Sequence, residues 1–176
     1  RAARDPRAIL EDVQGADWLP DGSNLVVSHY VDGRYRLEFP IGKPVYETSG
    51  WISDPRVSPD GERIAFTDHP AWGDNRGDIA VVDRSGKKTT LAADFATVHG
   101  VVWAPGGREV WFTGVKGDEG STLNEVDLSG RSRVVYTSLA AIELFDIAAD
   151  GRLLVGRQQP ERETLALLAG YADPRV

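Results

Sequence analysis

Short apolar runs alternate with glycine-containing turns along the whole chain. The clearest example begins at residue 55, where an apolar run enters the turn S-P-D-G at 58–61, and it includes a second turn, R-S-G, at 84–86. Short runs rich in β-branched residues and bounded by turn residues are typical of β-strands. The strands expected after the entering run are 63–67, 78–83 and 87–91. This stretch therefore predicts a meander of four antiparallel strands with a tight turn at each short corner.

This four-stranded unit recurs, which is the strongest signal in the sequence. The first turn closes with Gly22, Gly61, Gly107 and Gly151, so successive copies are 39, 46 and 44 residues apart. The second turn closes with Gly42, Gly86, Gly130 and Gly170. Four strands in each repeat of about 40 to 45 residues are the signature of β-propeller blades. The sequence predicts an all-β fold, a β-propeller of four-stranded antiparallel blades with about four blades visible, as either a closed small ring or part of a larger propeller.

The repeats divide residues 1–176 into four blades of a single β-propeller domain. The expected blades are 14–48, 51–92, 98–138 and 142–170. Residues 8–13 precede the first repeat and predict an outer strand that completes another blade. The fourth blade has an expected third strand at 164–168, but little chain follows it for a fourth. Either strand 8–13 closes a small ring, or the four blades belong to a longer array whose unpaired blade edges allow self-association.

Two positions of the repeat suggest how the blades meet. A bulky apolar residue stands two positions before the proline, or its equivalent, in each first turn: Trp18, Val57, Trp103 and Ile147. We expect Trp18 and Trp103 to pack between blades. The preceding position holds Asp17, Arg56 and Asp146 in three of the blades, and we expect these residues to line a central channel. Mixed charge there favours a polar ligand or a peptide terminus over an apolar ligand, and hydrogen bonding between neighbouring blades is the alternative role.

The loops between second and third strands vary in length and composition, and the longest of them is residues 68–77. Because function usually resides on loops held by a rigid scaffold, we predict a site for a protein or peptide partner on this rim. The candidate residues are Trp51, Asp68, His69, Trp72, Asp74 and Arg76. An aromatic side chain exposed beside charged loops suits a partner-binding surface. The alternative role for the two tryptophans is to cover the end of their blade.

Composition and missing motifs exclude several classes of function. The net charge is −7 with both signs interspersed, which argues against a nucleic-acid groove. Absence of cysteine excludes disulfides and thiolate metal sites, and it fits both the bacterial cytoplasm and an exported domain. No apolar run reaches the length of a membrane span. The chain contains no serine-hydrolase elbow, zinc-protease motif, phosphate-binding loop or dinucleotide fingerprint, so we expect no enzymatic activity.

The three histidines need separate consideration because the repeat places them at comparable positions. His29 and His69 end second strands, and His99 begins an inner strand, so all three are expected near one rim. Such residues either share a metal ion or are simply polar groups of the rim. The oxygen-bearing residues of the long loop do not follow the order of an EF-hand. We therefore predict neither a metal site nor a cofactor.

The unit at 57–91 resembles the TolB-like propeller repeat in its segments S-P-D-G, E-R-I-A-F and D-I-A-V-V-D-R-S-G. The resemblance extends over essentially the whole chain, with departures at Gly106 and at Ala149, where proline is expected. The segment L-E-F-P-I-G-K at 37–43, followed by G-W-I and D-H-P, resembles propellers at the C-terminus of bacterial serine/threonine protein kinases. These resemblances imply six blades and a sensing or interaction module that binds protein or peptide partners at one rim or in the channel.

We therefore predict a non-catalytic interaction or sensor module that binds a protein or peptide through its rim loops. Two alternatives remain. Similar repeats form gating or accessory propellers of prolyl-oligopeptidase-like peptidases, and a propeller fragment of this kind can have a purely structural role in assembly.

Overall fold

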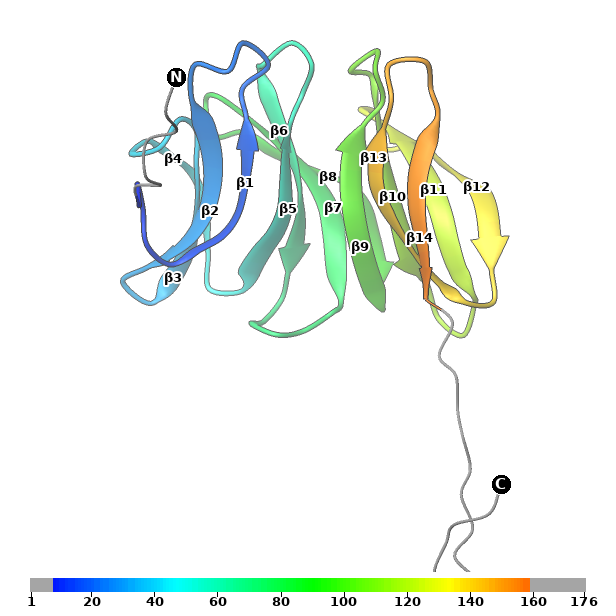
Figure 1. The fold of residues 1–176 in the computed structure, drawn as a ribbon. Helices are drawn as coiled ribbons and strands as arrows, with labels where there is room; N and C mark the ends of the chain where they lie inside the picture. The colour runs from blue at the N-terminus through cyan, green and yellow to red at the C-terminus, as the bar shows by residue number, and fades with distance from the viewer. Residues whose placement is uncertain (1–7, 159–176) are drawn as a thin grey trace, which may run out of the picture.

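The computed structural model describes residues 8–158, which form four antiparallel β-sheets placed side by side (Figure 1). The first sheet contains β1 (Val13–Trp18), β2 (Leu25–Val31), β3 (Arg34–Glu38) and β4 (Pro44–Thr48). The second contains β5 (Trp51–Val57), β6 (Arg63–His69), β7 (Gly77–Asp83) and β8 (Lys88–Phe95). The third contains β9 (Thr97–Trp103), β10 (Glu109–Val115), β11 (Ser121–Asp127) and β12 (Ser132–Ser138). The fourth contains β13 (Ala141–Ile147) and β14 (Leu153–Gln158).

Strand order within every sheet follows chain order, so each sheet is a meander and corresponds to one blade. This arrangement confirms the predicted all-β fold with four-stranded antiparallel blades, three of them complete and one two-stranded within the described residues. The inner strands β1, β5, β9 and β13 lie next to one another along one face (Figure 1). The described residues include no helix long and apolar enough to cross a membrane.

The first turn of each repeat has the same geometry in all four blades. Its glycine has a positive φ, for example 73° at Gly61 and 85° at Gly151, a conformation that costs glycine little. The N–H of Gly61 donates to the carbonyl oxygen of Ser58 at 2.8 Å, and the equivalent bond at Gly151 is also 2.8 Å. The carboxylate of Asp60 accepts the Ser58 hydroxyl at 2.5 Å and the Glu62 N–H at 3.0 Å. The turn sequence therefore fixes each inner strand relative to its second strand.

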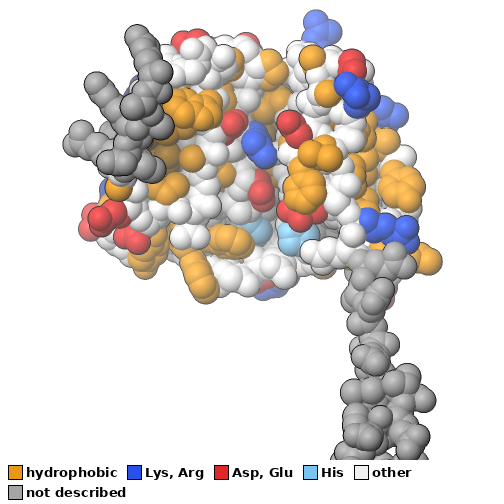
Figure 2. All heavy atoms as spheres, in the orientation of Figure 1, with side chains coloured by type: hydrophobic (Ala, Val, Ile, Leu, Met, Phe, Trp, Pro, Cys, Tyr) orange, Lys and Arg blue, Asp and Glu red, His pale blue; other side chains and the backbone are white. Residues whose placement is uncertain are grey.

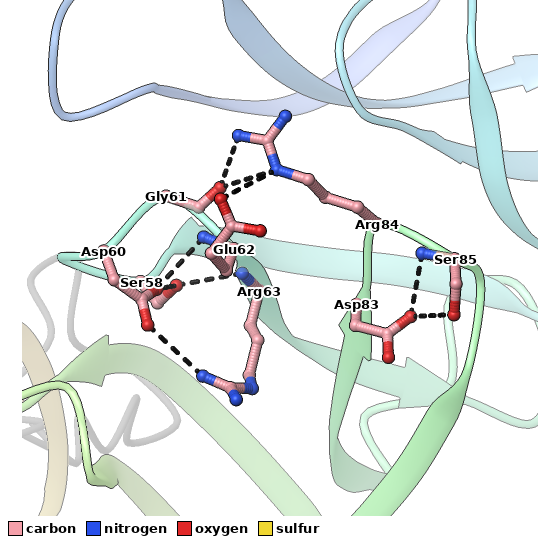
Figure 3. A network of polar contacts seen from close by, with 8 residues as sticks. All are labelled: Ser58, Asp60, Gly61, Glu62, Arg63, Asp83, Arg84 and Ser85. Carbon is pink, nitrogen blue, oxygen red and sulfur yellow. Dashed lines mark hydrogen bonds and ion pairs between the residues drawn. The ribbon is translucent and has the colours of Figure 1, made fainter.

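In the second blade, Arg84 connects the two kinds of turn (Figure 3). Its guanidinium donates to the carbonyl oxygen of Gly61 through Nε at 3.1 Å and through Nη2 at 2.6 Å. The same group lies 3.4 Å from a Glu62 carboxylate oxygen and 4.6 Å from the centre of the Phe39 ring in the first blade. Arg84, which belongs to the second turn, thus binds the first turn of its own blade and contacts an aromatic ring of the preceding blade.

The hydrophobic core consists of layers between blades, because each sheet has apolar side chains on both faces. The first layer joins Val26, Leu37 and Phe39 of the first blade to residues such as Ile64 and Phe66 of the second. A second layer of similar composition separates the second and third blades. The third layer is thinner, and its buried members are Val102, Leu123, Ile142 and Leu144. Packing between neighbours therefore stabilises the blades, as in other repeat proteins.

The two tryptophans expected between blades differ in burial. Trp103 is 8% exposed, and its indole N–H donates to the carbonyl oxygen of Arg56 in the preceding blade at 2.9 Å, so its prediction is confirmed. Trp18 is 62% exposed, so the prediction that it packs between blades is wrong. The physical reason is position: within residues 8–158 no blade precedes the first one, and the surface that receives Trp103 has no counterpart for Trp18.

The strand expected at residues 8–13 is not present. Residues 8–12 lie outside the strands, and Val13 is the first residue of β1. Asp12 has a φ of 56°, in the left-handed region, which interrupts an extended run at this point. Its carbonyl oxygen still accepts the N–H of Tyr30 at 3.2 Å. The expected third strand of the fourth blade at 164–168 lies outside the described residues.

We predict that Trp103→Ala lowers the free energy of unfolding by about 3–5 kcal/mol, because it leaves a cavity between two blades and removes an indole hydrogen bond. Chemical denaturation of the purified chain measures this loss. The control is Trp72→Ala, whose side chain is 70% exposed and should change stability by less than about 0.5 kcal/mol. Equal losses in the two variants would contradict the packing described here.

Candidate functional site

The blades present two rims of different character. The first turns of the repeats lie at the top of Figure 1, and we call this end the turn rim. The loops between second and third strands lie at the bottom, and we call this end the loop rim; its longest loop, residues 70–76, joins β6 to β7. The predicted channel residues lie near the turn rim, and the predicted partner-binding residues lie near the loop rim.

Two of the predicted partner-binding residues, Trp51 and His69, hold the 70–76 loop in place. The rings of Trp51 and His69 are stacked with centroids 4.2 Å apart, and the Trp51 indole N–H donates to the carbonyl oxygen of Asp74 at 3.1 Å. His69 is buried, and its Nδ1 lies 2.7 Å from the carbonyl oxygen of Arg76. Because a carbonyl oxygen only accepts, Nδ1 carries a proton, and the second ring nitrogen lies 2.9 Å from the hydroxyl oxygen of Ser53.

Asp74 and Arg76 close the same loop. The Arg76 Nε lies 2.9 Å from a carboxylate oxygen of Asp74, whose other oxygen accepts the Arg76 N–H at 2.9 Å. The Arg76 side chain and then its backbone N–H lower the pKa of Asp74 to about 2. The carboxylate is thus ionised throughout the neutral range, and the pair braces the loop.

Asp68 joins the first two blades. Its carboxylate accepts the phenol hydroxyl of Tyr46 at 2.8 Å and pairs with the ammonium of Lys88. Burial, and then the hydrogen bond to Asp68, raises the pKa of Tyr46. Burial also opposes the charge of Lys88, but the hydrogen bonds to Asp68 and Tyr46 outweigh it, so the pKa of Lys88 is raised. This half-buried triad connects β4 with β6 and β8.

Trp72 differs from its neighbours because it is 70% exposed. It lines a hollow of about 440 Å³ together with Tyr30, Tyr35, Asp12 and Gly50. A second hollow of about 560 Å³ is lined by residues that include Asp68, His69, Arg76, Asp78 and Asp94. The loop therefore borders both an aromatic hollow and an acidic one: Trp72 lines the first, and the predicted residues Asp68, His69 and Arg76 line the second.

Tyr30 and Tyr35 were missed by the sequence interpretation. Tyr30 is 47% exposed and Tyr35 is buried, with ring centroids 5.1 Å apart. Both flank the short loop at Asp32 and Gly33, which belongs to the same rim as Trp72. The available signal was the position of these aromatic residues next to a second-to-third-strand loop.

The three histidines do not converge. His29 is buried, and its Nε2 lies 2.8 Å from a carboxylate oxygen of Glu38, whereas His99 is exposed on β9. Within residues 8–158 there is no group of three or more His, Cys, Asp or Glu that could hold a metal ion.

The predicted channel residues Asp17, Arg56 and Asp146 line one hollow of about 490 Å³ near the turn rim. Figure 2 shows acidic and basic side chains gathered over this face of the inner strands. The Arg56 guanidinium donates to the carbonyl oxygens of Val101 at 3.2 Å and Phe145 at 3.4 Å, and it lies 4.0 Å from the Asp17 carboxylate. These charges thus make contacts across all four blades, in agreement with the alternative that they hydrogen-bond neighbouring blades.

Comparison with known proteins shows the fold alone. No family model and no curated protein matches this chain. Among solved structures, TolB from Acinetobacter baumannii is 17% identical, with a TM-score of 0.62 over 90% of this chain and 39% of the TolB chain. A putative TolB from Agrobacterium tumefaciens is also 17% identical, with a TM-score of 0.55 over 82% of this chain and 57% of that chain. The fold is therefore that of TolB propellers, and the chain spans less than two thirds of these proteins.

We predict that stability falls as the pH is lowered from about 7 to about 5, in part because of His69. Burial holds the pKa of folded His69 below its usual value near 6.5, despite the opposing hydrogen bond to Arg76. Between the folded and unfolded pKa values the unfolded chain binds more protons, so stability rises with pH in that window. Melting temperatures measured across it should fall less for His69→Gln than for wild type. The exposed His99→Gln variant should retain the wild-type dependence, and an unaltered dependence in His69→Gln would refute the assignment.

Proposed function

We propose that this chain is a non-catalytic interaction module of the sensor type, and that it binds an extended segment of a protein partner at the loop rim. The observation that carries this proposal is a large aromatic side chain, Trp72, that is 70% exposed on a loop whose remaining residues are held in place. The sequence resemblance to propellers attached to bacterial protein kinases supports the same class of function.

A rigid loop favours binding because little conformational freedom is lost when a partner docks. The loop that carries Trp72 is fixed on its inner side by the stacked rings of Trp51 and His69 and on its outer side by the Asp74–Arg76 pair. Tryptophan and tyrosine are the residues that most often dominate binding energy at protein interfaces. Trp72 therefore has both the chemistry and the support of a binding anchor.

The aromatic hollow beside Trp72 suits one or a few side chains of an extended segment. Tyr30 is a second aromatic residue of its lining, and Gly50 allows the backbone to approach closely, since a methyl group built there would lie 1.9 Å from the carbonyl oxygen of His69. Its volume of about 440 Å³ is in the range of small-ligand pockets, which are mostly apolar with few polar groups. Asp12 supplies a carboxylate at this site.

The neighbouring acidic hollow adds a preference for charge. It contains Asp78 and Asp94, with the Asp78 carboxylate accepting the N–H of Asp94 at 3.1 Å. A segment that crosses the loop next to Trp72 passes from aromatic to acidic surroundings. We therefore propose a partner segment with an apolar or aromatic side chain followed by basic residues, because opposite charges steer association and fix the register of the segment.

The test is selection from a random-peptide phage library on the immobilised chain, followed by titration of the enriched peptides in solution. We expect the combined variant Trp72→Ala and Tyr30→Ala to weaken binding on the order of 30-fold, the loss typical of hot-spot residues. Its melting temperature should stay within a few degrees of wild type, because Trp72 and Tyr30 are both exposed.

The control is Trp18→Ala, which removes another exposed tryptophan and leaves the loop rim untouched. Substitution of His69 or Asp74 is a poorer test, since both residues hold the loop itself. If the selected peptides bind the double variant as tightly as wild type, the site is not at the loop rim and the proposal fails.

A further inference from the structure

Successive blades meet through a contact that repeats along the chain. We call the side of a blade toward its predecessor the leading face and the opposite side the trailing face. At the leading face of the third blade, the Trp103 indole donates to the carbonyl oxygen of Arg56 at 2.9 Å. A methyl group built at Gly107 would lie 3.4 Å from the Pro59 ring, and the equivalent distance from Gly61 to Pro20 is 3.7 Å. A leading face thus supplies an anchor residue and a turn glycine, and a trailing face supplies a carbonyl oxygen and a proline.

The first blade presents a leading face without a neighbour among the described residues. Trp18 has the same place in the repeat as Trp103, yet it is 62% exposed. Ile9 and Val13, which precede it, are 74% and 38% exposed. The groups that make the contact in the third blade are present here and open to solvent.

The fourth blade presents a trailing face in which Ala149 stands at the position of the proline. Val155 is four residues after its turn glycine, as Val26 and Ala65 are in their blades. Val26 and Ala65 are fully buried in the layers toward the next blade, whereas Val155 is 38% exposed. The face that other blades cover with a successor is therefore uncovered here within the described residues.

Asp146 strengthens this comparison, because it has the repeat position of Asp17. Asp17 uses one carboxylate oxygen for the N–H of Trp18 at 3.0 Å and the other for the N–H of Val57 in the next blade at 2.8 Å. Asp146 uses one oxygen for the N–H of Ile147 at 2.8 Å. Its other oxygen has no hydrogen-bond partner among residues 8–158. This oxygen is therefore available to accept a backbone N–H of a following blade, as the Asp17 carboxylate does.

We propose that these two faces bind each other between two copies of this chain, with the leading face of the first blade on the trailing face of the fourth. A second copy is the favoured occupant because the same chain displays both halves of an interface that it already forms internally. Capping repeats usually carry a polar outer face, whereas the first and fourth blades expose apolar side chains within the described residues. The contact is head-to-tail, so Trp18 of one copy occupies the place at Asp146 of the other that Trp103 has at Arg56. This surface is separate from the loop rim.

The first test is the mass of the particle in solution as a function of protein concentration, by sedimentation or light scattering. We expect the wild-type chain to associate, and Trp18→Ala to weaken association on the order of 30-fold. The matched control is Trp72→Ala, which removes an equally exposed tryptophan from the loop rim and should associate like wild type. Circular dichroism verifies that each variant is folded.

The second test uses complementing variants. Trp18→Ala spoils only the leading face and Val155→Asp only the trailing face, so each should be monomeric alone. An equimolar mixture should form a one-to-one complex, because one intact interface remains between the two variants. Val155→Ser replaces Val155→Asp if the aspartate variant does not fold. The proposal is overturned if the wild-type chain is monomeric at all concentrations, if Trp18→Ala associates as tightly as wild type, or if the mixture does not assemble.

Discussion

Most apolar side chains of this fold are buried between neighbouring blades. A single four-stranded sheet with apolar side chains on both sides cannot remove them from water by itself. The contact between blades therefore brings the inner strands close together, and at two junctions it places a turn glycine against a proline of the preceding blade. Arg56 shows the same constraint at the inner surface, where one side chain contacts the other three blades.

This constraint separates the two rims. At the turn rim, glycines and carboxylates are used for local hydrogen bonds and for contacts between blades, which leaves little freedom for change. At the loop rim, the 70–76 loop is held by the stacked pair of Trp51 and His69, and the carbonyl oxygen of Asn75 accepts the N–H of Val98 in the third blade at 3.2 Å. A loop held in this way can display a side chain such as Trp72 at low cost in entropy.

The sequence predicted the fold well because its signals are local. The expected strand at 78–83 agrees with β7 to within one residue, and the four glycines expected to close the first turns all have a positive φ. The arrangement of the candidate site was harder to predict from the sequence. Trp51 and His69 are strand-end residues near the 70–76 loop that contains Asp74, and the sequence pattern does not reveal that these three bind one another rather than a ligand. The burial of Trp18 was wrongly inferred from Trp103, since a repeat position fixes the direction of a side chain but not the presence of a neighbour.

The unequal layers between blades determine where the fold opens first. Among residues 8–158, eleven buried residues form each of the first two layers and four form the third. In a linear array, the free energy of local opening is set by the layers that a unit shares with its neighbours, so the β13–β14 hairpin has the lowest barrier to detachment. Amide protons of this hairpin should exchange with solvent well before those of β6 and β7, which have a layer on each side. The second blade should therefore exchange its amide protons most slowly, and protection should decline toward the fourth blade.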